Sequence, residues 1–120
     1  MALRKFKERI KGDIWLVYLH TDPDTFQAET GEDPEATDAV TQAAKRRLHF
    51  MKECADVPTI IHELVHAYYD YLCLDSASIT AGQLEEILAD MFGYNGVEMV
   101  VRAQKLHKKF HGTKSGKPSK

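Results

Sequence analysis

The stretch VPTIIHELVHAYYDYL, residues 57–72, has the apolar spacing of an α-helix that packs against a core. Asp56 can accept hydrogen bonds from the free amides at the start of such a helix, and Pro58 is tolerated in its first turn. The side chains expected on the apolar face are Ile61, Leu64, Val65, Tyr68 and Leu72, and those expected on the opposite face are His62, Glu63 and His66. The sequence therefore predicts a helix from about Asp56 to Leu72 that presents a polar group away from the core.

The polar group has the order His62-Glu63-Leu64-Val65-His66, which is the HExxH pattern of zinc hydrolases. Because a helix makes a turn in about 3.6 residues, the two imidazoles lie on one side of it. Two neutral imidazoles can bind one Zn²⁺, and the carboxylate of Glu63 can take a proton from a water molecule on that metal. We expect His62 and His66 to be metal ligands and Glu63 to be the general base.

The segments before this helix differ in pattern. Leu3, Phe6 and Ile10 recur at helical spacing, so an amphipathic helix is expected over residues 2–11. Residues 14–19 (IWLVYL) form a short apolar run rich in β-formers and are expected to be a buried strand. The segment from the turn at 21–24 to about residue 38 is acidic and is expected to be mostly loop.

The segments on either side of the HELVH helix complete the expected elements. Residues 38–52 fit a helix in their first half and a strand at 47–51, and a hairpin with its turn near residues 42–45 is the preferred interpretation. Thr80 and Gln83 have the spacing of a capping box, which predicts a second helix from about residue 81. The glycines in Gly93–Gly96 are expected to end or bend it before helical spacing resumes at 97–110.

The second helix supplies the expected third ligand. Glu86 and Asp90 share one side of it, opposite the apolar residues, whereas Glu85 falls on the flank. We expect Glu86 to ligate the metal and Asp90 to accept a hydrogen bond from a ligand imidazole, which fixes the tautomer of that ring.

The segments HELVHAYYDY and EEILADMFG together resemble the active-site helices of thermolysin-like gluzincins, which carry HExxH followed by ExxxD. Residues 86–93 are also similar to the ExxAxxFA segment of ImmA/IrrE-type metallopeptidases, which are small cytoplasmic proteins common in phages and mobile elements. The resemblance covers roughly residues 46–93. It implies a zinc peptidase with His62, His66 and Glu86 as ligands and Glu63 as general base.

These observations predict an α+β protein with a minimal zincin-like fold, in which a small antiparallel or mixed sheet packs on the HELVH helix and on the second, ligand-bearing helix. Residues 1–110 are expected to form one domain that binds one Zn²⁺ and hydrolyses peptides or proteins, and residues 111–120 to form a disordered basic tail. An edge strand at Arg47–Met51 is a candidate for pairing with an extended substrate. The donor that would stabilise the transition state is left open among His49, Tyr68, Tyr69, His107 and His111.

Composition limits the remaining possibilities. The sequence has neither a secretory signal nor an apolar run of about 20 residues, and its two cysteines lack CxxC spacing, so a cytoplasmic protein with reduced thiols is expected. The basic residues concentrate in 1–11 and 102–120, which sum to roughly +11 against roughly −13 for the middle of the chain. This segregation defines an alternative function, in which a zincin-fold protein with little or no catalysis contacts nucleic acid or an acidic protein through its basic ends.

Overall fold

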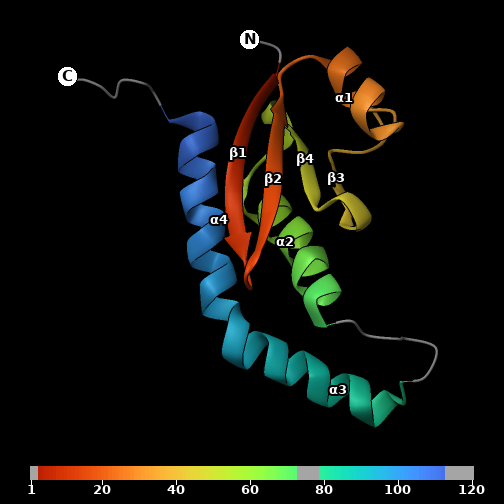
Figure 1. Cartoon of the computed structure of the whole chain (residues 1–120), viewed down its shortest axis with the longest axis vertical. Coiled ribbons are helices and arrows are strands. Elements are labelled where there is room, and N and C mark those ends of the chain that lie inside the picture. The colour runs from red at the N-terminus through yellow and green to blue at the C-terminus, as the bar shows by residue number, and fades with distance from the viewer. Residues whose placement is uncertain (1–2, 73–78, 113–120) are drawn as a thin grey trace.

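The computed structural model describes residues 3–72 and 79–112. It confirms the α+β prediction, because a mixed four-stranded sheet packs against helices (Figure 1). The strands are β1 (Leu3–Ile10), β2 (Asp13–His20), β3 (Ala39–Gln42) and β4 (Arg47–Met51). The α-helices are α1 (Pro23–Thr30), α2 (Val57–Leu72), α3 (Ala81–Asp90) and α4 (Gly96–His111).

The sheet has the strand order β1-β2-β4-β3. β1 pairs antiparallel with β2, β2 pairs parallel with β4, and β3 pairs antiparallel with β4. β4 is therefore an interior strand, so the expectation that Arg47–Met51 forms an exposed edge is wrong. The expected hairpin is present, with β3 as its first strand and its turn at Ala43–Lys45. β3 lies at the end of the strand order, so it is the edge strand beside the HELVH helix.

The expectation of a helix over residues 2–11 is also wrong, because these residues form β1. Phe6, Glu8 and Ile10 alternate with exposed residues along the strand, and Glu8 occupies an inward position that sequence patterning reserves for apolar side chains. Arg102 of α4 neutralises Glu8 there, with Nη1 at 2.7 Å from Oε1. The pairing partner β2 follows after Lys11 and Gly12, whose φ angles of 52° and 90° suit a tight hairpin turn.

The expectation of a loop up to residue 38 is wrong over Pro23–Thr30, which is α1. Asp22 caps this helix by accepting a hydrogen bond from the amide of Asp24 at 2.8 Å, and Gly31 ends it at a φ of 76°. Phe26 is fully buried and anchors α1 to the sheet. A single buried aromatic among polar residues gives too weak a periodic signal for α1 to be expected from its sequence.

The hydrophobic core lies between the sheet and the helices α2 and α4. The strands contribute Trp15, Val17, Leu19, Leu48 and Phe50, α2 contributes Ile60, Leu64, Ala67 and Tyr68, and α4 contributes Met99, Ala103, Leu106 and Phe110. At about 25 cal/mol per Å² of buried apolar area, these side chains are the main source of stability. They fix α2 against the sheet, so the HELVH segment is held on a packed element.

Residues 81–111 form one bent helical rod. Thr80 and Gln83 make the expected capping box at the start of α3. A π-helical turn at Met91–Asn95 then joins α3 to α4, and Figure 1 shows that the chain changes direction there, as the glycine pattern predicted. α4 packs along α2, whereas α3 extends beyond the body of the protein. Most of the connection expected at 73–79 and of the tail expected at 111–120 lies outside the described residues.

Candidate metal centre

The two histidines of the HELVH segment lie on the solvent side of α2. His62 and His66 are both exposed, and their ring centroids are 5.1 Å apart. Asp56 fixes the start of this helix by accepting a hydrogen bond from the amide of Thr59 at 2.9 Å, which satisfies one of the free amides there. The structure therefore brings together two exposed imidazoles, one helical turn apart, as the sequence predicted.

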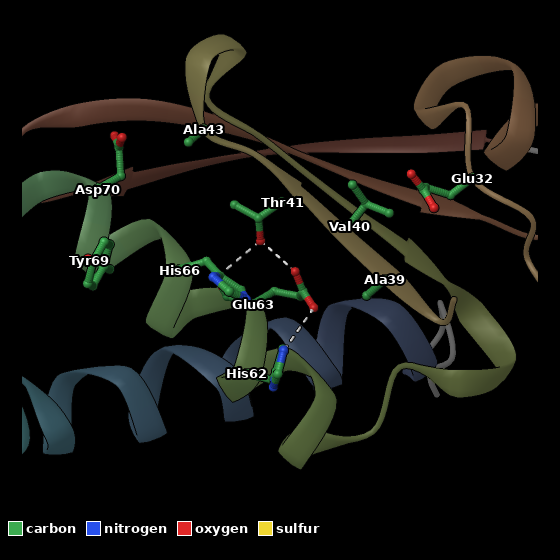
Figure 2. Close-up of a pocket in the computed structure, with 10 residues that line it drawn as sticks. All are labelled: Glu32, Ala39, Val40, Thr41, Ala43, His62, Glu63, His66, Tyr69 and Asp70. Atoms are coloured by element: carbon green, nitrogen blue, oxygen red, sulfur yellow. Dashed lines mark hydrogen bonds and ion pairs between the residues drawn. The ribbon is translucent and has the colours of Figure 1, made fainter. Parts of the chain in front are cut away.

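Glu63 occupies a different position from the one that the sequence pattern gave it. Glu63 is only 6% exposed, because its side chain turns away from the histidine face and toward β3. There Thr41 donates a hydrogen bond from Oγ1 to Oε1 of Glu63 at 2.5 Å, while Oε2 lies 3.9 Å from Nε2 of His62 (Figure 2). The carboxylate thus sits between the edge strand and the first histidine.

An open cleft of about 520 Å³ runs between β3 and α2 over these groups. Figure 2 shows the side chains of Thr41, His62, Glu63 and His66 meeting in this cleft. Glu32 and Asp70 add two further carboxylates to its lining, so the cleft is acidic as well as rich in imidazole. A cation is the kind of ligand that such a lining favours.

The predicted third ligand does not join this cluster. Glu86 and Asp90 lie on α3, where both residues are exposed and no residue is buried. Within residues 3–72 and 79–112, no three histidine, cysteine, aspartate or glutamate side chains lie close enough together to hold a metal ion. Glu86 as ligand and Asp90 as its hydrogen-bonding neighbour stay predictions.

The residues present fit part of a zinc site. Imidazole nitrogen is a preferred zinc donor, and His62 and His66 are exposed and within one helical turn of each other. A catalytic zinc has three protein ligands and an open position, so one ligand has to come from outside this pair. Glu63, which has Thr41 as a hydrogen-bond donor, is placed as a proton acceptor beside the pair.

The five candidates for a transition-state donor separate in the structure. Tyr69 lines the cleft. Tyr68 is buried and donates to Glu98 at 2.7 Å; burial, followed by this hydrogen bond, raises its pKa to about 12. Nε2 of His111 lies 2.9 Å from the carbonyl oxygen of Ala55. The ring of His107 lies against that of His111, and the two centroids are 4.6 Å apart.

His49, the remaining candidate, belongs to a buried histidine pair on the other face of the sheet. Its Nδ1 lies 2.9 Å from Nε2 of His20, and its Nε2 lies 3.0 Å from Oε1 of Gln42. Burial, and then the nearby charges of His20, Arg47 and Lys45, lowers the pKa of His49 to about 4. Burial also lowers the pKa of His20.

Sequence reasoning missed Thr41 and the histidine pair. Alternation along residues 47–51 placed Leu48 and Phe50 on one side of the strand, and the same alternation puts His49 on the other. In the structure the hairpin turn begins one residue later than expected, at Ala43, and the register puts Thr41 opposite Leu48. No local signal pairs Thr41 with Glu63, because that contact depends on how α2 packs against β3.

Comparison with known protein families, with curated proteins and with solved structures finds no match to this chain.

Proposed function

We propose that this protein is a zinc-dependent peptidase whose active site is the cleft between β3 and α2. The observation that carries the proposal is the joint placement of His62, Glu63 and His66, with both imidazoles exposed and the carboxylate oriented by a hydrogen bond at the edge of a sheet. A structural zinc site needs no such carboxylate, because its ligands close the coordination sphere by themselves.

Zn²⁺ bound by His62 and His66 would supply a Lewis acid that polarises a peptide carbonyl and makes a water molecule acidic at neutral pH. Glu63 accepts the proton of that water as it attacks the carbonyl carbon, and then passes the proton to the leaving amine. Tyr69, which lines the cleft, is the donor candidate best placed to hydrogen-bond the carbonyl oxygen.

The third ligand in this proposal is Glu86, with Asp90 behind it. Because α3 extends away from α2 in the structure, ligation by Glu86 requires an α3 helix, from this chain or from a second copy, to meet the histidine face. The two faces of α3 suit such a contact: its carboxylates lie on one side, and on the other the apolar residues Leu84 and Leu88 are 44% and 43% exposed.

An extended peptide is the substrate that the cleft suits best. β3 is an edge strand, so one side of its backbone is free to pair with an added strand. A peptide added there runs past Glu63 and the two histidines. The acidic lining from Glu32 and Asp70 favours peptides with basic side chains near the cleaved bond.

The alternative, a binding protein that uses its basic ends, loses part of its support. Lys11 pairs with Glu98 at 3.3 Å, and both Arg102 and Lys109 pair with Glu8, at 2.7 and 3.2 Å. These cations therefore hold β1 and α4 together, and their positive charge is locally neutralised.

None of the helices within residues 3–72 and 79–112 combines the length and apolarity of a membrane span.

The test is zinc content and peptide cleavage in matched variants. Purified wild-type protein is expected to hold about one zinc per chain and to cleave members of a broad peptide library. Glu63→Gln is expected to keep its zinc and lose cleavage by about a thousandfold or more. His66→Ala is expected to lose both. A Glu63→Gln protein that cleaves as fast as wild type, or a wild-type protein without zinc, would refute the proposal.

A further inference from the structure

Thr41 stands out because its two halves face different parts of the cleft. Its hydroxyl donates to Oε1 of Glu63 at 2.5 Å and lies 3.4 Å from the backbone carbonyl of the same residue. A hydroxyl has one proton, and the shorter contact to the charged acceptor is the stronger one. The side chain of Thr41 therefore holds the carboxylate of Glu63 in one orientation.

The backbone of Thr41 points the other way, toward the open edge of the sheet. The amide of Met51 donates to the carbonyl of Asp38 at 3.0 Å, so that opposed pair is hydrogen-bonded. In an antiparallel ladder such pairs alternate with non-hydrogen-bonded ones. Counting along the register, Val40 opposite His49 is bonded, whereas Thr41 opposite Leu48 is not. The amide and carbonyl of Thr41 are thus directed away from β4.

We propose that Thr41 is a positioning residue that ties substrate pairing at the β3 edge to the orientation of the general base. This inference rests on the proposed function. A peptide that pairs with β3 takes its hydrogen bonds from residues such as Thr41, and the same residue aims Glu63 at the reacting water. Thr41 acts through Glu63 and takes no part in bond making itself.

The burial of Glu63 explains why this positioning matters. Its residue is 6% exposed, and the hydroxyl of Thr41 is its closest hydrogen-bond donor among the contacts of the described residues. A carboxylate in such a place adopts the rotamer that its donor selects, because leaving it without a partner is costly. Without the hydroxyl, none of the side chains in residues 3–71 and 79–112 is in hydrogen-bond contact with the carboxylate of Glu63, since Nε2 of His62 lies 3.9 Å from Oε2.

The experiment compares Thr41→Val, which keeps the shape and loses the hydroxyl, with Thr41→Ser, which keeps the hydroxyl. Zinc-loaded full-length protein and the best peptide from the library give kcat and KM. Thr41→Val is expected to lower kcat about 10- to 100-fold with KM changed less than about threefold, because a hydrogen bond to a charged group is lost. Thr41→Ser is expected to stay within about threefold of wild type.

Two controls separate positioning from folding. Thr30→Val removes a hydroxyl at the end of α1 that donates to the carbonyl of Phe26 and accepts from the amide of Glu32, and it should leave kcat unchanged. Zinc content should be the same in all three variants, and each should be folded at the temperature of the assay. On zinc-free protein, the ¹³C resonance of the Glu63 carboxylate should move in Thr41→Val and stay in place in Thr41→Ser.

The outcomes are distinct. An active wild type with a fully active Thr41→Val, or a folded Thr41→Ser as impaired as Thr41→Val, would overturn the role of Thr41 and leave the peptidase proposal standing. A wild type that neither binds zinc nor cleaves any peptide would overturn both. Should Thr41→Val fail to fold, rescue by Thr41→Ser and its unchanged ¹³C resonance still decide the question.

Discussion

Mild acid should destabilise this protein through the histidine pair buried beneath α1. His20 and His49 are both fully buried, and their ring nitrogens are 2.9 Å apart. Tyr18 stacks on His49 with centroids 4.5 Å apart, and Phe26 packs edge-on against His20. Because burial disfavours the charged form, the folded protein keeps His49 neutral down to a pKa of about 4, whereas the unfolded chain takes up the proton near the ordinary value of 6.5.

The direction and size of the effect follow from proton linkage. The unfolded state binds more protons than the folded state between about pH 6.5 and pH 4, so the free energy of unfolding falls as the pH falls through that window. For His49 alone, the loss between about pH 7.5 and pH 5 is about 2 kcal/mol, and it approaches about 3 kcal/mol near pH 4. The pKa of His20 is shifted in the same direction, so it adds to the loss.

Urea titrations followed by circular dichroism at about pH 7.5 and pH 5 measure this quantity. His49→Gln is expected to be less stable than wild type at the higher pH and to lose about 2 kcal/mol less on acidification. His107→Gln, which changes a histidine outside the pair, should keep the wild-type difference. Equal wild-type stability at the two pH values, or the same acid loss in His49→Gln, would show that the pair does not control acid stability.

Two further predictions concern the charges that hold α4 and the missing zinc ligand. Arg102→Met should lower the free energy of unfolding by about 2 kcal/mol in urea titration, because Glu8 is 6% exposed and keeps Lys109 as its one cationic partner among the described residues. Glu8→Gln should lower the free energy of unfolding by less than half as much, and equal losses would contradict this reasoning. Glu86→Ala and His66→Ala should each lose zinc, as measured by metal analysis. Mixing the two after joint refolding should restore about one zinc per four chains if Glu86 comes from a second copy, and none if it comes from the same chain, whereas full zinc content in Glu86→Ala alone would exclude it as a ligand.

The sequence determined the elements whose signals are local. The spacing of apolar residues in 57–72 sufficed for α2, the Thr80 and Gln83 pair for the start of α3, and the apolar run 14–19 for β2. These signals work because helix periodicity, capping and β-propensity act within a few residues of chain. His62 and His66 are brought together for the same reason, since one helix carries both.

Tertiary structure decided whatever depends on contacts between distant segments. The charged Glu8 obscured the alternation of β1, because its inward position is tolerated through pairing with Arg102 and Lys109, which lie on α4. β4 was expected at the edge of the sheet, but the edge strand is β3, because β4 also pairs parallel with β2. That pairing depends on how distant segments pack and not on any residue within β4. The side chain of Glu63 points toward β3 and not along the histidine face, because the hydroxyl of Thr41 donates a hydrogen bond to it there. The sequence by itself thus determined the helix that carries the candidate metal ligands, and the packing of α2 against an edge strand decided how the general base is held.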